Sequence, residues 1–484
     1  MARMDLTVAQ AIKIVEDIFF HTSNRIYRLN ISLNPLDREP APTLDLKGNK
    51  IPQLWAFTQF LANNPSVKYI RLQWLDYTAT LRVRIFPVGQ ALSMFRQGRS
   101  VGITKAVFGL LQDDSIAPGF SPVGEYELIP AFESLRLGER PGYVTVQSEF
   151  REKDGSEVAI CPRTVLRREV EKAAKYGISF LVGFEVEVVF MASHVVDGKN
   201  VYDCASVSKG HAWSAASALR NPKIMDAIEE ILVALERSQI KLQQFHPESA
   251  PGQYEFVTGP LPPLDSVDTL LASRDIICAV AEKHLLRATF VPKTSLNTGG
   301  TGAHVHISMS PEEKHLSFYA GVLKHLRAIM AFTNCNMLSY EDSMWSDGRY
   351  VAWGTQNRET PLRKIEGSHW ELKCMDGMAN TYLALAAILG IGLRGILDGE
   401  QLNLKDCPAD PSLLNDDTKQ KLGIKELLPT SISQALNSLA ADRELTEVLG
   451  RSVVEAYQDV KKLESNRLMA MEARDRQVFL IGRY

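Results

Sequence analysis

Two glutamates, Glu185 and Glu187, interrupt an otherwise apolar and strand-like run, LVGFEVEVVF. Because side chains two positions apart on a strand point the same way, we expect both carboxylates to leave one face together. Two ionised carboxylates side by side in an apolar setting repel each other and lose hydration, so they need a strong cation or must be protonated. A bound divalent metal would meet this need, and an edge strand with its polar face in water is the open alternative.

Three later stretches carry further side chains of the types that bind metals. Glu248 and Glu255 flank a Pro-Gly turn signal in HPESAPGQYEF. His304 and His306 share one face of a second strand-like run in TGAHVHIS, and Glu371 lies in HWELK. Carboxylate oxygens with one or two imidazoles suit magnesium or manganese, whereas a zinc site would more often use Cys. The sequence therefore predicts one site that holds two metal ions.

Five motifs follow one another in the order FEVEVVF, HPES…GQYEF, GTGAHVH, NRETPLR and WELKCMDGMANTYLALAAILG. This ordered set resembles the glutamine synthetase superfamily from about residue 50 onward. The resemblance implies an α+β fold, in which a small N-terminal β-grasp-like domain precedes a catalytic domain with an antiparallel curved sheet surrounded by helices. The implied divisions are a helical extension and linker, the N-terminal domain and the catalytic domain, at residues 1–50, 51–158 and 159–484.

The resemblance also implies the ligands of two Mg²⁺ or Mn²⁺ ions per site, with ATP as co-substrate. In the family, six side chains divide between the two ions. By this resemblance, one ion is assigned to Glu185, His304 and Glu371, and the other to Glu187, Glu248 and Glu255.

Further motif residues would bind the nucleotide and stabilise the reaction. Arg358 and Arg363 match the family's phosphate-binding arginines at the same spacing, and charge that builds up on a transferred phosphoryl group needs such fixed donors. His306 resembles the histidine that contacts the nucleotide phosphates, and Lys373 replaces a late arginine of the motif. His246, two positions before a predicted metal ligand, is a catalytic candidate together with Arg358. Taken alone, such residues are more often surface arginines and structural histidines.

A loop of the family's N-terminal domain carries an aspartate that helps to deprotonate ammonium in the active site of a neighbouring subunit. Asp113 and Asp114, in LLQDDSIAPGF, lie at about the corresponding place and are catalytic candidates by resemblance. A solvated turn is the alternative. The resemblance further implies a homo-oligomer of two stacked rings with active sites between subunits.

Several departures from the family fall among the residues that would hold an amino-acid substrate. Tyr340 stands where glutamine-forming members have the arginine that binds the α-carboxylate, and a flap glutamate is expected near Ser346. Lysine replaces a forked donor by a point charge, so carboxylate recognition would weaken or change. The other differences are Asp347 beside the flap position, His369 and Lys373 at two arginine positions, and Gly299 at an asparagine position with Asn297 displaced.

The residues for the metals and ATP match the family, whereas the residues for the amino-acid substrate do not. This difference predicts an ATP-dependent carboxylate–amine ligase of the glutamine synthetase type that acts through an acyl phosphate. It would be a glutamine synthetase, a gamma-glutamyl-amine ligase or another amide ligase, and its substrates need not be glutamate and ammonia. The alternative is a non-catalytic relative with a structural or signalling role. Guanidino-kinase chemistry is a weaker option, which the Glu-x-Glu and His-x-His strands disfavour.

Composition bounds the remaining function classes. The chain of 484 residues exceeds the usual single-core limit, and its net charge of −3 gives no general attraction to nucleic acid or an anionic membrane. Six widely spaced cysteines without a C-x-x-C pair favour a reducing compartment, so we expect a cytoplasmic location. The apolar stretch 379–393 is too short to span a bilayer and predicts a buried helix.

The elements expected to position these residues follow from hydrophobic spacing. The helix that begins near Pro162 and ends before Gly177 is expected to pack its apolar face inward and to expose Arg163, Arg167 and Arg168. Other predicted helices are 6–29, 52–63, 222–238, 269–287 and 316–333, with a linker at 30–50, two strands within 67–88 around a turn at 76–80, and a helical cap over 428–484.

Overall fold

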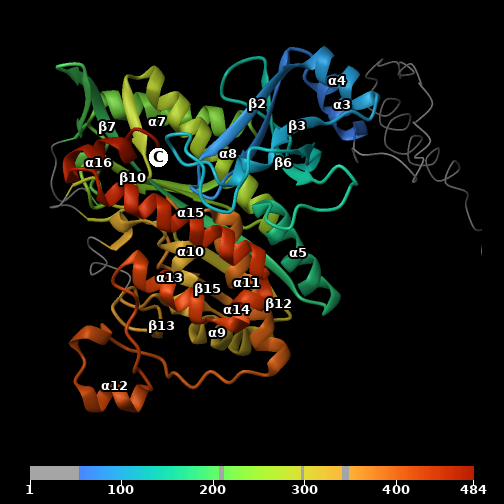
Figure 1. Cartoon of the computed structure of the whole chain (residues 1–484). Coiled ribbons are helices and arrows are strands. Elements are labelled where there is room, and N and C mark those ends of the chain that lie inside the picture. The colour runs from blue at the N-terminus through green and yellow to red at the C-terminus, as the bar shows by residue number, and fades with distance from the viewer. Residues whose placement is uncertain (1–53, 207–211, 296–298, 341–347) are drawn as a thin grey trace, which may run out of the picture. The chain divides into compact units, whose positions relative to one another are not determined.

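The computed structural model describes residues 54–206, 212–295, 299–340 and 348–484 (Figure 1). The predicted helix 6–29, the linker 30–50 and the departures at Asn297, Ser346 and Asp347 lie outside the described residues. The division between an N-terminal and a catalytic domain at residue 158 stays a prediction.

The first sheet has six strands in the order β2-β1-β6-β4-β3, with β5 also paired to β6. The strands β1 and β6 run parallel, whereas β1 and β2 form the antiparallel pair predicted around the 76–80 turn. That turn is held by Asp76, whose Oδ1 accepts hydrogen bonds from the backbone N–H groups of Thr78 and Thr80. The elements are α3 (Leu54–Asn63), β1 (Tyr69–Leu75), β2 (Leu81–Pro87), α4 (Val88–Arg96), β3 (Val101–Thr104), β4 (Glu125–Pro130), β5 (Arg136–Leu137) and β6 (Tyr143–Arg151).

The second sheet has nine strands in the order β13-β14-β15-β12-β7-β10-β9, with β8 and β11 also paired to β7. Its pairings are antiparallel except for β13 with β14. The strands are β7 (Ser179–Val196), β8 (Lys199–Cys204), β9 (Leu242–Pro247), β10 (Gln253–Thr258), β11 (Leu286–Thr289), β12 (Val305–Ser310), β13 (Trp353–Thr355), β14 (Leu362–Glu366) and β15 (His369–Leu372). The predicted α+β class is confirmed.

Helices pack around this second sheet, and the buried apolar side chains of both sheets belong to one continuous core. The predicted helix 316–333 is two helices that meet at His325, whose ring is hydrogen-bonded to Asp442 at 2.7 Å. The helices are α5 (Pro162–Lys175), α6 (Ala215–Ala218), α7 (Pro222–Arg237), α8 (Pro263–Lys283), α9 (His315–Lys324), α10 (Leu326–Thr333), α11 (Thr381–Asp398), α12 (Asp416–Leu422), α13 (Ile432–Ala441), α14 (Arg443–Leu449), α15 (Arg451–Met469) and α16 (Ala473–Ile481).

The predicted buried helix at 379–393 corresponds to α11, which packs against α5, α9 and α14. The helix continues to Asp398, so the expectation that this stretch is too short to span a bilayer is wrong: among the described residues, α11 is the one helix long and apolar enough to do so. In this structure 78% of its apolar window is buried inside the protein. The helix therefore forms the centre of the helical layer.

The prediction that Arg163 lies on a solvated face is wrong. Its side chain is 3% exposed, and Nη2 lies 2.9 Å from Oδ2 of Asp268 on α8, while Nη1 lies 3.0 Å from Oε1 of Glu149 on β6. The reason is that α5 packs against β6, α8 and α11 at once, so the part of its basic face that carries Arg163 is also covered. Arg163 thus joins the first sheet to the helices around the second by a buried ion-pair network.

We expect Arg163→Ala to destabilise the protein by about 3–5 kcal/mol, because it leaves buried Asp268 without its cation. A fall in the urea midpoint, followed by circular dichroism, would report this loss. Lys175→Ala at the exposed end of the same helix is the matched control and should change stability by less than about 0.5 kcal/mol. Equal midpoints for the two variants would contradict a structural role for the buried pair.

Candidate metal centre

Strand register places three of the candidate side chains in one row across the second sheet. Glu187 on β7 is the direct cross-strand partner of Glu255 on β10, which in turn lies opposite His246 on β9. On the other side of β7, the backbone N–H of Glu185 donates to the carbonyl of His304 at 3.1 Å. Cross-strand partners have Cβ atoms about 4.5–5.5 Å apart, so carboxylates from distant segments are forced together.

The first group consists of Glu185, His304 and Glu371, whose ligand atoms lie within 4.8 Å of one another. Nδ1 of His304 is 2.6 Å from Oε2 of Glu185 and 3.3 Å from Oε1 of Glu371. Glu371 is 1% exposed, and its other oxygen is 2.6 Å from Nε of Arg363. These three residues are the set that the resemblance assigned to one ion.

The remaining predicted ligands form two overlapping groups. Glu187 gathers with Glu185 and Glu255, whereas Glu248 gathers with His246 and Glu255. His246, expected to act in catalysis, thus lies among the metal-capable side chains, with Nδ1 3.5 Å from Glu248 and Nε2 3.4 Å from Glu255. Glu255 is the residue that the two groups share.

Two donors that sequence reasoning missed hold Glu187 in place. Its Oε2 accepts hydrogen bonds from Nε2 of Gln253 and from the backbone N–H of Gly302, both at 2.8 Å. Gln253 stands two positions before Glu255 on the same strand, so period-two spacing could have identified it. Gly302 also leaves space, because a Cβ there would lie 2.6 Å from Nε2 of His304 and 2.9 Å from Oε1 of Glu187.

Electrostatics divides these buried carboxyl groups into two kinds. Burial would raise the pKa of Glu185, but hydrogen bonds from His304 and His306 hold that pKa well below its ordinary value. For Glu187, burial raises the pKa to about 7 despite the nearby His304. Burial and repulsion from Glu185 and Glu187 raise the pKa of Glu255 to about 9. Glu187 and Glu255 therefore lack sufficient cationic compensation from the described chain.

This donor set fits hard divalent cations. Buried carboxylates in direct cross-strand contact would repel once ionised, and a divalent ion between them removes that cost. The groups are rich in oxygen, with one imidazole in each of two groups and no cysteine among them. Mg²⁺ and Mn²⁺ prefer such ligands, so the residues present fit the predicted ions.

A cavity of about 560 Å³ opens beside these groups, and its lining includes Arg358 and Lys373. Nζ of Lys373 donates to the backbone carbonyl of Arg358 at 2.6 Å. Arg358 itself is an exposed residue of the lining. Trp213, Gln244 and Glu359 also line it. Sequence reasoning singled out none of the three, although Glu359 stands inside the motif NRETPLR.

Other predicted site residues lie deeper or elsewhere. Arg363 is 6% exposed and does not line the cavity, because its guanidinium is paired with Glu371. His306 bonds Oε1 of Glu185 at 3.0 Å through Nε2 and faces Nε2 of His369 at 2.9 Å through Nδ1. Tyr340 is likewise absent from the cavity lining and packs against the core.

The two candidate aspartates lie away from this cavity within the chain. Asp113 pairs with Arg467 of α15, and Asp114 lies 3.7 Å from Arg82, with 86% of its own side chain exposed. Neither lines the cavity beside the metal-capable groups. A role in the active site of a neighbouring subunit stays a prediction.

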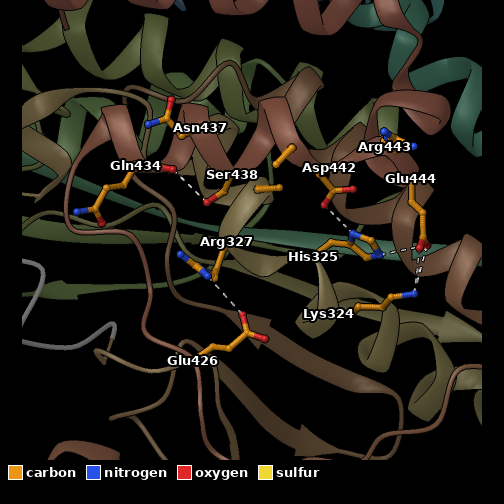
Figure 2. Close-up of a pocket in the computed structure, with 12 residues that line it drawn as sticks. Lys324, His325, Arg327, Glu426, Gln434, Asn437, Ser438, Asp442, Arg443 and Glu444 are labelled. Atoms are coloured by element: carbon orange, nitrogen blue, oxygen red, sulfur yellow. Dashed lines mark hydrogen bonds and ion pairs between the residues drawn. The ribbon is translucent and has the colours of Figure 1, made fainter.

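A larger cavity, of about 750 Å³, lies between α10, α13 and the start of α14 (Figure 2). Its buried His325 bonds Asp442, and Lys324 pairs with Glu444 at 3.2 Å, while Arg327 faces Glu426 at 3.7 Å. Most charged groups here are thus neutralised by one another. This cavity has no group of three metal ligands among the described residues, so the smaller cavity is the better candidate site.

Comparison with known proteins gives three kinds of finding. Residues 159–477 match the family described as glutamine synthetase, catalytic domain. The chain is 39% identical to Protein fluG of Emericella nidulans over 99% of its own length, but it spans only 56% of that protein. It is 30% identical to a gamma-glutamylpolyamine synthetase of Streptomyces coelicolor, over 83% of this chain and 90% of that one.

More distant relatives include the glutamine synthetase of Thermococcus kodakarensis, which is 27% identical over 80% of this chain and 87% of that one. Among solved structures, GmaS in its ADP complex superposes with a TM-score of 0.74. That comparison covers 87% of this chain and 98% of GmaS at 23% identity, so it shows the same fold.

We expect Gly302→Ala to weaken Mn²⁺ binding at least tenfold while changing fold stability little. The new methyl group would displace the ends of His304 and Glu187, which are flexible side chains rather than backbone. Calorimetric titration with Mn²⁺ measures the effect. Gly89→Ala is the control, because a Cβ at this exposed helical glycine meets nothing within 4 Å. Unchanged Mn²⁺ affinity in Gly302→Ala would contradict the proposed ligand geometry.

The metal-free protein should become less stable as pH rises from 6 to 9. A carboxyl group whose folded pKa is raised contributes stability below its unfolded pKa and loses it as pH rises through the folded value, about 7 for Glu187 and about 9 for Glu255. His304, whose pKa is also raised, acts in the same direction. The thermal midpoint in EDTA should therefore fall over this range, and Mg²⁺ should reduce the fall.

Glu255→Gln isolates the effect from other titrating groups, because the amide keeps the shape but cannot ionise. In this variant the decline between pH 6 and pH 9 should be smaller than in the wild type. A wild-type midpoint that stays level or rises in EDTA would disprove the uncompensated carboxylate pair.

Proposed function

The chain belongs to the glutamine synthetase family, and on this premise we propose that it is an ATP-dependent ligase that joins a carboxylate to ammonia or an amine. The observation that carries the proposal is the convergence of three metal-capable groups beside a cavity that also contains Arg358. The chain spans about half of the fluG protein. The activity of any longer protein that contains this chain is therefore a proposal as well.

The proposed metal ligands are the side chains of the three groups. Glu185, His304 and Glu371 would hold one ion. Glu187, Glu248 and Glu255 would hold the other; they come from two groups that share Glu255, and His246 lies beside them. Divalent ions bound there would supply positive charge that neutralises the phosphates of ATP. The hydrogen bonds from Gln253 and Gly302 fix the orientation of Glu187, so the carboxylate needs little rearrangement to bind.

Arg358 is the proposed catalytic cation. In an acyl-phosphate mechanism, the substrate carboxylate attacks the γ-phosphoryl group of ATP, ADP leaves, and the amine then displaces phosphate from the acyl carbon. Negative charge spreads over the phosphoryl oxygens during transfer, and a guanidinium exposed in the cavity can stabilise it. The bond from Lys373 to the Arg358 carbonyl positions that backbone. His306 and Arg363 would act indirectly, by fixing the orientations of the Glu185 and Glu371 carboxylates.

This proposal leaves the identities of the carboxylate substrate and the amine substrate open. The cavity lining lacks a described arginine other than Arg358, which supports a substrate different from glutamate or a different mode of holding it. The similarity to a gamma-glutamylpolyamine synthetase supports an organic amine as acceptor. We also propose the stacked double ring, in which Asp113 or Asp114 would deprotonate the amine at a neighbouring site, and a cytoplasmic location.

The test is ADP release from ATP and Mg²⁺ across a panel of carboxylates, each combined with ammonium, a monoamine or a diamine. Release that requires both substrates, with formation of the amide, would support the ligase. Glu187→Gln serves as the blank. Tight ADP binding without release for any pair would favour the non-catalytic alternative.

For the pair that reacts, Arg358→Gln should lower kcat about 10²–10³-fold, the usual loss when one donor to a transition-state charge is removed. Mn²⁺ affinity should stay unchanged, because Arg358 is outside the three metal-capable groups. Arg443→Gln, an exposed arginine at the larger cavity of Figure 2, is the matched control and should keep the wild-type kcat. A fall of less than threefold in kcat for Arg358→Gln would exclude this role.

A further inference from the structure

We propose that a pocket between the first sheet and α7 binds a small anion that carries phosphate groups. The pocket has a volume of about 350 Å³, and its ionisable side chains other than Tyr143 are Lys68, Arg140 and Arg237. None of the described residues that line it has a carboxylate. It shares no lining residue with the cavity beside the metal-capable groups, so it is a second site.

The cationic side chains come from the 138–142 turn and from two segments that are joined to it by hydrogen bonds. The backbone N–H of Lys68 donates to the carbonyl of Gly142 at 2.7 Å, and the guanidinium of Arg237 donates to the carbonyl of Gly138 at 3.0 Å and to that of Glu139. Gly142 has a φ of +83°, a backbone conformation that glycine adopts without strain. The walls are therefore prearranged, which lowers the ordering cost of binding.

The one acidic residue of the 138–142 turn does not oppose an anion in the pocket. The side chain of Glu139 is buried and is paired with Lys283 on α8. By contrast, Lys68 and Arg140 are exposed, and neither forms an ion pair with another described residue. The positive charge of the pocket is thus left uncompensated by the described chain.

This arrangement favours phosphate over other small ligands. Guanidinium groups present paired N–H donors that match two phosphate oxygens, and lysine adds a mobile point charge. Three like charges around a pocket of this size favour a ligand with two or more negative charges. The ring of Tyr143 completes the lining and is itself stacked on Tyr69 at a centroid distance of 4.9 Å. Such a ring offers an apolar wall but no competing charge.

The test is calorimetric titration of the full chain with tripolyphosphate in EDTA, so that metal-dependent binding is absent. We expect the double variant Lys68→Gln/Arg140→Gln to bind at least tenfold more weakly than the wild type. Both positions are exposed, so the variant should keep its thermal midpoint. Arg358→Gln, at the other cavity, is the control and should keep the binding, because it removes only the cation beside the metal-capable groups.

Two results would overturn the proposal. The first is equal affinity of the wild type and the double variant, which includes the case in which neither binds. The second is a loss of binding in Arg358→Gln with retention in the double variant, since it would place the anion at the other cavity. The same titration is repeated with citrate, which carries carboxylates instead of phosphates. Tighter binding of citrate than of tripolyphosphate would overturn the assignment to phosphate.

Discussion

The direct opposition of Glu187 and Glu255 across β7 and β10 is the constraint on which the site depends. A sheet register cannot be adjusted by one residue without turning every side chain of the strand to the other face. The backbones that carry the two carboxylates are therefore held side by side by the hydrogen bonds of the sheet, and a shift of register cannot relieve the repulsion. The protein can hold them as protonated acids or as ligands of a cation, and this choice links the fold to the proposed chemistry.

The surroundings of these carboxylates are arranged for orientation rather than for neutralisation. Glu187 receives hydrogen bonds from an amide side chain and a backbone N–H, neither of which carries a charge. Glu185 and Glu371 are instead bound by His304, and Glu371 also by Arg363. The charges of Glu185 and Glu371 are thus compensated by the described chain, whereas the charges of Glu187 and Glu255 would need a bound ion.

Sequence reasoning succeeded where function follows from local periodicity. Spacing by two in a strand put Glu185 with Glu187, and the terminal Pro and Gly marked α5. It could not anticipate that Glu187 meets Glu255 and that Glu255 meets His246, because register between distant strands depends on the whole sheet. The same limit explains the wrong expectation for Arg163, a basic residue on a helix of ordinary amphipathic pattern.

Arg163 and the metal-capable groups show how one chain handles buried charge in two ways. The guanidinium of Arg163 meets carboxylates from β6 and α8 at hydrogen-bond distance, so its charge is satisfied by the described protein. Among the described residues, Glu187 and Glu255 meet histidines only at the longer distances of 4.0 and 3.4 Å, and burial raises the pKa of each. A buried group that the fold already neutralises needs no ligand and supports structure. A buried group that the fold leaves with a raised pKa destabilises the protein unless something binds, so its presence is better explained by function than by stability.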